Sequence, residues 1–133
     1  MAMHKCKPLI LIVEDDRGMA QFSSLLLERQ GNRTFVAHTS VQAHSFVLEN
    51  NPDMYVIDIE LPDGDGISLC HDFRQISDAP ILFLAGRSKT TDILLGLRAG
   101  GDYYLAKPYD KKEFIAVVNS LLCRAELTRK KTV

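Results

Sequence analysis

Short, continuous apolar runs alternate with segments of helical periodicity along the 133-residue chain, and this alternation limits the possible folds more than any other feature. A strand without polar alternation is typical of a parallel sheet that is buried on both faces. Strict alternation with helices implies right-handed crossovers. The sequence therefore predicts an α/β fold, with one parallel sheet covered by helices on both sides. The five predicted strands are residues 9–13, 34–37, 54–59, 81–85 and 103–106.

Five helices are predicted from residues at helical spacing and from residues typical of helix ends. Ser40 is a candidate cap for the second helix, and Thr90 or Thr91 for the fourth. Asp110 with Glu113 gives the last helix a start that is similar to a capping box. The third helix covers residues 67–76, and the other predicted helical faces consist of Met19, Phe22, Leu25 and Leu26 in the first helix, Val41, His44, Val47 and Leu48 in the second, Ile93, Leu94 and Leu97 in the fourth, and Phe114, Val117, Val118, Leu121 and Leu122 in the last.

The composition fits one soluble domain and argues against several classes of function. The 16 Lys and Arg residues against 17 Asp and Glu give a net charge of −1, which argues against a domain whose main task is to bind nucleic acid. No apolar run approaches the roughly 20 residues that span a bilayer, so no membrane partner is expected. Cys6, Cys70 and Cys123 fit neither a disulfide framework nor a metal site, which favours the cytoplasm. We assign residues 1–124 to the domain and 125–133 to a polar tail or the start of a linker.

Charged residues follow the ends of three predicted strands. Glu14, Asp15 and Asp16 follow the first strand, Asp58 lies at the end of the third, and Lys107 follows the fifth. Because the carboxyl ends of parallel strands meet at one edge of a sheet, we expect these charges to converge there. Clustered carboxylates stay ionised only if a cation joins them, and Mg²⁺ prefers oxygen ligands of this kind. The pattern therefore suits a phosphoryl group held on a carboxylate.

Helix capping is an alternative explanation for some of these acids. A single Asp after a strand is usually a helix cap or a turn residue, and we prefer this interpretation for Asp16, Asp63 and Asp65. It fits Asp58 less well, because Ile59 continues the apolar run beyond it and a cap would lie later in the loop.

Three segments together resemble the receiver domain of bacterial two-component response regulators. They are residues 9–16 (LILIVEDD), 52–66 (PDMYVIDIELPDGDG) and 99–109 (AGGDYYLAKPY), within a resemblance that extends over about residues 7–123. It implies the flavodoxin-like (βα)5 sandwich of the CheY fold, with the sheet order 2-1-3-4-5. It also implies a phosphoacceptor that takes its phosphoryl group from a sensor histidine kinase. Such a domain is not an enzyme, although it assists its own phosphoryl transfer and dephosphorylation.

The resemblance implies a role for each residue of the site. Asp58 would be the phosphoacceptor, and Lys107 would contact the phosphoryl oxygens. Mg²⁺ would be bound by Asp15, by Asp58 and by the backbone carbonyl of Glu60, with Glu14 acting through water.

The resemblance also concerns residues around the site. The bond before Pro108 would be cis, and Tyr104 matches an aromatic residue that changes rotamer on activation. A plain aromatic residue at the edge of the core is the alternative for Tyr104. Ala85 departs from the family, which has a Thr or Ser hydroxyl there to bond the phosphoryl group. Alanine cannot make this bond, so the switch would be weakened, or replaced through Ser88 or Thr90.

Residues 96–100 and the last helix resemble receivers that precede a winged-helix DNA-binding domain. This implies transcription regulation by the whole protein, with no nucleic acid bound by the domain itself. Such receivers commonly form homodimers through helix 4, strand 5 and helix 5 by charged pairs. Glu113 fits one member of these pairs, but other positions are not charged. A more apolar dimer face and the absence of a dimer both stay open, since the uncharged positions are Ile93, Tyr103, Val117 and Asn119.

Two other functions compete with the phosphoacceptor switch. One is an aspartate-nucleophile phosphatase, for which Asp58 and Glu60 give an Asp-x-acid motif. The chain has no room for a substrate-capping domain, however, and Asp58 lies on the third strand instead of the first. The other is an interaction module that works without phosphorylation. Ala85 supports this second alternative, whereas Asp15 and Lys107 oppose it.

Overall fold

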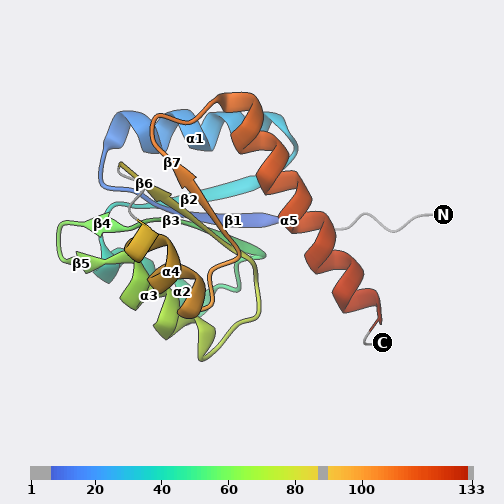
Figure 1. Ribbon diagram of the computed structural model, residues 1–133. Coiled ribbons are helices and arrows are strands. Elements are labelled where there is room, and N and C mark those ends of the chain that lie inside the picture. Colours follow the sequence, from blue (N-terminus) through green and yellow to red (C-terminus); the bar gives the residue numbers. More distant parts are fainter. Residues whose placement is uncertain (1–6, 87–89, 132–133) are drawn as a thin grey trace.

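A five-stranded parallel sheet forms the centre of the computed structural model (Figure 1), which describes residues 7–86 and 90–131, with the side chains of 90–92 and 129–131 left undescribed. The order β2-β1-β3-β6-β7 confirms the predicted order of the five strands. All four neighbouring pairs are parallel. The strands are β1 (Leu9–Val13), β2 (Arg33–Ala37), β3 (Met54–Asp58), β6 (Ile81–Ala85) and β7 (Tyr103–Ala106).

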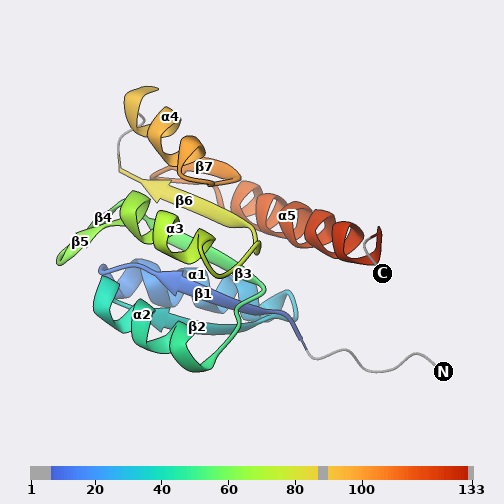
Figure 2. The same ribbon diagram turned by 90° about the horizontal axis from the view of Figure 1, so that it is seen from below.

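The helices cover both faces of this sheet, as the alternation predicts. Figures 1 and 2 show α1 (Arg17–Arg29) and α5 (Lys111–Lys131) on one face. The opposite face carries α2 (Ser40–Glu49), α3 (Gly66–Arg74) and α4 (Thr90–Arg98). A short antiparallel pair, β4 (Glu60–Leu61) and β5 (Gly64–Asp65), lies where the sequence predicts a loop, and β3 ends one residue earlier than predicted.

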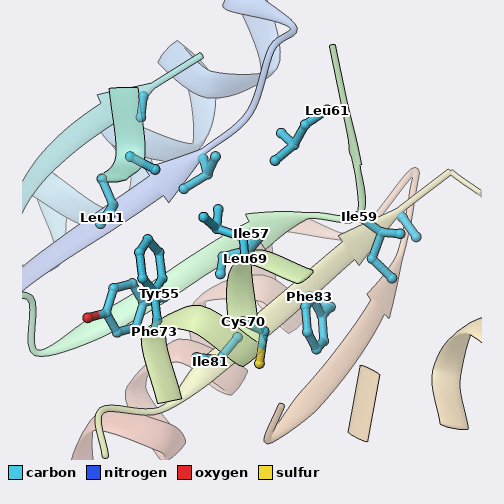
Figure 3. Packing of buried hydrophobic residues seen from close by; sticks show 14 residues of the cluster. Leu11, Tyr55, Ile57, Ile59, Leu61, Leu69, Cys70, Phe73, Ile81 and Phe83 are labelled. Carbon is cyan, nitrogen blue, oxygen red and sulfur yellow. The ribbon is translucent and has the colours of Figure 1, made fainter. Parts of the chain in front are cut away.

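Alternate residues of each central strand enter two separate apolar clusters. Leu11 and Val13 of β1 face the α2, α3 and α4 side, whereas Ile10 and Ile12 face α1 and α5. Figure 3 shows the first cluster, in which the rings of Tyr55 and Phe73 stack with their centroids 4.8 Å apart. Burial of each such side chain contributes about 1.5–3 kcal/mol, so the two clusters fix the sheet between its helix layers.

Four helices begin at side chains that accept a hydrogen bond from the backbone N–H three residues later. Asp16 caps α1 at 2.9 Å, Asp65 caps α3 at 2.8 Å, and Asp110 accepts at 3.3 Å before α5. These bonds confirm capping for Asp16 and Asp65. The cap of α2 is Thr39, at 3.0 Å, and the prediction of Ser40 was wrong by one residue, because Ser40 is already helical.

The predicted inner faces of three helices are right only in part. Leu26 of α1 and Val47 of α2 pack partly buried against the core clusters as predicted, but several other predicted residues are exposed and smaller residues are buried instead. In α1, Ala20, Ser23 and Leu27 are buried, while Phe22 and Leu25 are about half exposed at 45% and 48%. A small side chain lets a helix approach the sheet more closely, so bulky residues at neighbouring positions are turned toward solvent.

The same correction applies to α2 and α4. Ala43 is the buried residue of α2, and Val41 and Leu48 of that helix are exposed. In α4 the predicted inward residues Leu94 and Leu97 are exposed, and Gly96 is buried instead; the exposed fractions are 53% for Leu94 and 43% for Leu97.

The last helix is confirmed both in position and in orientation. Phe114, Val118 and Leu121 are buried, and Val117 and Leu122 pack against the same cluster. The helix continues to Lys131, so residues 125–131 of the predicted tail are helical, while the boundary at residue 124 stays a prediction. None of the described helices combines the length and apolar character needed to cross a membrane.

Candidate functional site: an acidic cluster around Lys107

The structure brings Lys107 together with two of the strand-end carboxylates. Its Nζ atom donates to Asp58 Oδ2 at 2.7 Å and to Glu14 Oε1 at 2.6 Å. Asp58 is the last residue of β3, Glu14 follows β1, and Lys107 follows β7. Glu14 and Asp58 are only 2% and 5% exposed, so their charges are largely removed from water. The ammonium group therefore neutralises part of a buried negative charge.

The cluster changes the proton affinity of both partners of the shorter ion pair. Burial and the nearby Asp58 carboxylate raise the pKa of Glu14 to about 7, and Lys107 offsets part of this rise. Burial by itself lowers the pKa of Lys107, but the hydrogen bonds to Asp58 and Glu14 outweigh it and raise that pKa. Lys107 is therefore a fixed positive charge at neutral pH, while Glu14 exchanges its proton in that range.

Three carboxylates at this edge suit a hard divalent cation. Glu14, Asp15 and Asp58 each offer an oxygen, and these oxygens lie within 4.8 Å of one another. Asp15 is exposed and forms the solvent side of the group. Carboxylate oxygens match the ligand preference of Mg²⁺, and the exposed side at Asp15 gives access to the several waters that this ion keeps.

The loop after β3 orients the Asp58 carboxylate. The backbone N–H of Glu60 donates to Asp58 Oδ1 at 2.9 Å, so the two carboxylate oxygens have different donors. The chain then turns back and brings Gly66 against the backbone of Asp58, so closely that a Cβ atom at Gly66 would overlap the Asp58 carbonyl. A glycine is needed there for close approach of two backbones. A ligand role of the Glu60 carbonyl remains a prediction.

Ala85 lies at the carboxyl end of β6, where it is buried at 4% exposure. Its carbonyl accepts a hydrogen bond from the backbone N–H of Lys107 at 2.7 Å. The methyl side chain has no polar atom to offer to the site. Ser88 and the side chain of Thr90, which could substitute for a missing hydroxyl, lie outside the described residues.

Two further expectations concern the β7 end. The peptide bond between Lys107 and Pro108 is cis, as the resemblance predicts. Tyr104 is half-buried and packs against the core cluster on the α2, α3 and α4 side. The packing does not test whether Tyr104 changes rotamer on activation, and this role stays a prediction.

Three contacts near the site join distant segments, and the sequence pattern points to one of them. Asp63 accepts from the backbone N–H groups of Ser40 and Val41 at 2.7 and 3.0 Å, and these bonds hold its pKa below the usual range. His38 Nδ1 lies 3.0 Å from the Glu14 carbonyl oxygen. The third is a hydroxyl pair between Ser23 and Tyr109, 86 residues apart in the sequence. Such contacts depend on tertiary structure, and only the turn position of Asp63 points to a capping role.

The fold and the site together define a class of protein, namely a parallel α/β domain with one lysine among the carboxylates at the strand ends. Residues 10–119 match the response regulator receiver domain, and the chain belongs to this family. It is 36% identical over 122 residues to the DNA-binding response regulator MtrA of Mycobacterium tuberculosis, covering 92% of this chain and 54% of MtrA. It is 38% identical over 119 residues to the KDP operon transcriptional regulatory protein KdpE of Escherichia coli, covering 90% of this chain and 53% of KdpE.

Solved structures show the same fold over most of the chain. The receiver domain of the Francisella response regulator 1452 is 37% identical with a TM-score of 0.83, over 89% of this chain and 98% of that one. A two-component response regulator from Clostridium difficile is 31% identical with a TM-score of 0.86, over the same shares. The chain spans about half the length of the curated relatives named above.

Proposed function

We propose that this chain is the phosphoacceptor switch of a two-component system, and that Asp58 takes its phosphoryl group from a phosphohistidine of a sensor histidine kinase. The observation that supports this best is Lys107 Nζ held at 2.7 Å from Asp58 Oδ2 and 2.6 Å from Glu14 Oε1. A fixed cation beside an oriented carboxylate is the arrangement that phosphoryl transfer requires, because its chemistry depends on positioning and charge neutralisation.

In the proposed reaction, an Asp58 oxygen attacks phosphorus in line with the leaving nitrogen. The new bond joins that oxygen to phosphorus, the P–N bond breaks, and its electron pair leaves with the imidazole, which takes up a proton from water. Lys107 neutralises charge on the phosphoryl oxygens, and the Glu60 N–H holds the plane of the carboxylate. Mg²⁺ held by Asp15, Asp58 and the Glu60 carbonyl, with Glu14 acting through water, would supply the remaining positive charge. Later attack of water on phosphorus returns the free carboxylate and inorganic phosphate.

The first test is phosphorylation by acetyl phosphate with Mg²⁺, followed by intact mass. We expect the chain to gain one phosphoryl group, and Asp58→Asn to gain none. Asp65→Asn is a matched control, because asparagine caps a helix about as well as aspartate and Asp65 lies outside the cluster. Full uptake by Asp58→Asn would contradict the assignment. Absence of uptake in the unaltered chain, from acetyl phosphate and also from a histidine kinase, would favour the module that works without phosphorylation.

We further propose that the whole protein regulates transcription in the cytoplasm. The support is that the relatives are named as DNA-binding or transcriptional regulators and that the chain covers about half of each. Homodimerisation through α4, β7 and α5 belongs to the same proposal. Leu94, Leu97 and Tyr103 are exposed on α4 and β7, so an apolar face replaces charged pairs in this proposal.

The dimer is tested by light scattering of the phosphorylated chain. We expect the mass to double on phosphorylation, and Leu97→Glu to keep the chain monomeric, since a charge would be placed in the apolar contact. Leu48→Glu is the control, because Leu48 is exposed at 84% on α2, on another part of the surface. A monomer in every variant would refute the dimer without affecting the assignment of Asp58.

A further inference from the structure

We propose that Tyr109 is a positioning residue for Lys107, and that its hydrogen bond with Ser23 holds the loop carrying the lysine against α1. The inference rests on the proposed function, since it concerns how Lys107 is kept beside Asp58. In this role Tyr109 acts on Lys107 through the backbone of the loop.

The contact joins two segments that each lie next to residues of the site. The hydroxyl groups of Ser23 and Tyr109 are 2.6 Å apart. Ser23 lies in α1, the helix that follows directly on Glu14 and Asp15, and it is 1% exposed. Tyr109 follows Lys107 by two residues. The bond therefore joins the helix after the acids to the loop with the ammonium group.

The tyrosine ring itself is held in place by α5. It stacks on Phe114, with centroids 4.9 Å apart and ring planes 28° apart. Phe114 is fully buried in the cluster under α1 and α5. Stacking thus fixes the orientation of the ring independently of the hydroxyl bond. The hydroxyl adds a directional hydrogen bond to α1.

Lys107 is held at both ends of its short segment. On one side its own N–H donates to the Ala85 carbonyl at 2.7 Å, which extends the pairing of β6 with β7. On the other side Tyr109 bonds to Ser23. A lysine side chain is flexible and loses rotamer freedom when it is ordered. A fixed backbone at Lys107 therefore reduces the conformational entropy that is lost when the Nζ atom is positioned. A small displacement of that atom weakens both of its bonds to carboxylates.

The burial of Ser23 indicates that the hydroxyl pair is a specific hydrogen bond and does not only fill space. A buried hydroxyl without a partner is costly, and an alanine at this position would pack in the same space without that risk. Every buried side-chain nitrogen or oxygen in the described residues has a hydrogen-bond partner, and Tyr109 is the partner of Ser23. Two polar groups are thus matched inside an otherwise apolar contact.

The test compares Tyr109→Phe, Ser23→Ala and the double variant. Tyr109→Phe removes the hydroxyl and keeps the ring on Phe114. The double variant leaves no unpaired hydroxyl, so its stability recovers while the link stays broken. Ser24→Ala is the matched control, because Ser24 makes an equally short hydroxyl bond of 2.6 Å to Thr34, from the next position of the same helix.

Two quantities are measured in each variant. The first is the rate of phosphorylation by acetyl phosphate with Mg²⁺, which we expect to fall about fivefold in both single variants and the double, the factor that one neutral hydrogen bond is worth. The second is the NMR signal of the Lys107 ammonium group in the metal-free chain, which we expect to shift and broaden in the same three variants. Ser24→Ala should keep the rate within about twofold and leave the ammonium signal unchanged, because Ser24 bonds to Thr34 of β2 and not to the loop that carries Lys107.

Three results would overturn the inference. One is an unchanged rate and an unchanged ammonium signal in Tyr109→Phe. Another is recovery of the rate in the double variant, which would assign the loss to an unpaired hydroxyl. The third is an equal loss in Ser24→Ala. If the unaltered chain takes up no phosphoryl group, the proposed function fails, and the ammonium signal still reports separately whether Tyr109 positions Lys107.

Discussion

At the residue scale, the charge of the site is uneven. One ammonium group faces three carboxylates, and two of these are buried. Burial first, and then the neighbouring negative charge of Asp58, raises the pKa of Glu14. A divalent cation would compensate this negative charge, so Glu14 would link the stability of the fold to the binding of such a cation.

The pKa of Glu14 predicts the pH dependence of stability without metal. It is about 7 in the folded chain, against an ordinary value of 4.5. Between these values the folded chain binds more protons than the unfolded chain, so the free energy of unfolding falls as pH rises. We expect a loss on the order of 1–3 kcal/mol, since one pKa unit is worth about 1.4 kcal/mol. Urea unfolding in EDTA between pH 5 and pH 8 measures it.

Glu14→Gln is the variant that isolates this effect. Its uncharged amide should reduce the fall in stability between pH 5 and pH 8, whereas Glu49→Gln, at an exposed position, should leave the fall unchanged. The raised pKa of Lys107 affects stability only as pH rises above its ordinary value of 10.5, so it is constant in this window. Equal slopes in the unaltered chain and in Glu14→Gln would remove Glu14 as the cause.

At the element scale, two glycines in helices have opposite surroundings. A Cβ atom at Gly96 of α4 would lie 2.9 Å from Phe83 Cε2, whereas one at Gly18 of α1 would lie 3.4 Å from the Asp16 side chain. The same substitution therefore has different effects on packing in the two helices.

We expect Gly18→Ala to stabilise the chain by about 0.5–1 kcal/mol, because alanine is the better helix former. Gly96→Ala should destabilise it by about 1–2 kcal/mol, since overpacking against the Phe83 ring outweighs the same helix preference. Thermal unfolding of the two variants checks both signs. A stabilising Gly96→Ala would show that α4 can move away from β6 at no cost.

The turn between β4 and β5 is connected to α2 by Asp63. Its carboxylate accepts from two backbone N–H groups at the start of that helix. We expect Asp63→Ala to lower the midpoint of thermal unfolding, and Asp63→Asn to lower it less, because the amide oxygen still accepts one bond. Hydrogen exchange of the Ser40 and Val41 amides, which should become faster in Asp63→Ala, shows whether the loss lies in α2. Unchanged exchange would contradict the link.

At the scale of the whole molecule, the cluster joins the ends of β1, β3 and β7, so binding of a cation there should stabilise the entire fold. Magnesium at one hundred times its dissociation constant would add about 2.7 kcal/mol. We expect the gain to increase from pH 6 to pH 8, because loss of the Glu14 proton adds a negative charge beside the cation. Asp15→Asn should weaken the gain while leaving the metal-free fold intact, since Asp15 is exposed. Equal gains in this variant, measured by thermal unfolding, would exclude Asp15 as a ligand.

Much of the architecture could be predicted from the sequence. The strands are nearly pure apolar runs, so their positions and the convergence of Asp58 with Lys107 could be inferred from periodicity and from the geometry of parallel sheets. The faces of the helices could not. In α4, Leu94 and Leu97 share the helical spacing of a core face, and periodicity does not distinguish a core face from an exposed apolar one. The contact of Tyr109 with Ser23 joins distant segments and leaves no local pattern. For Asp63 the sequence predicts a cap or turn residue, but not which helix its carboxylate contacts.

The backbone hydrogen bond between Lys107 and Ala85 affects which substitutions this chain can accept during evolution. The bond uses an amide hydrogen and a carbonyl oxygen, which nearly every residue supplies. Substitution at position 85 therefore leaves this hydrogen bond in place and changes the volume and the polar groups of a side chain that is only 4% exposed. In a saturation library at this position that is screened for folded protein, we expect small residues to be retained and large ones to be lost. Selection at position 85 would then act on the volume of the side chain and on its ability to bond a phosphoryl group, while the backbone hydrogen bond between the two strand ends persists whichever side chain is present.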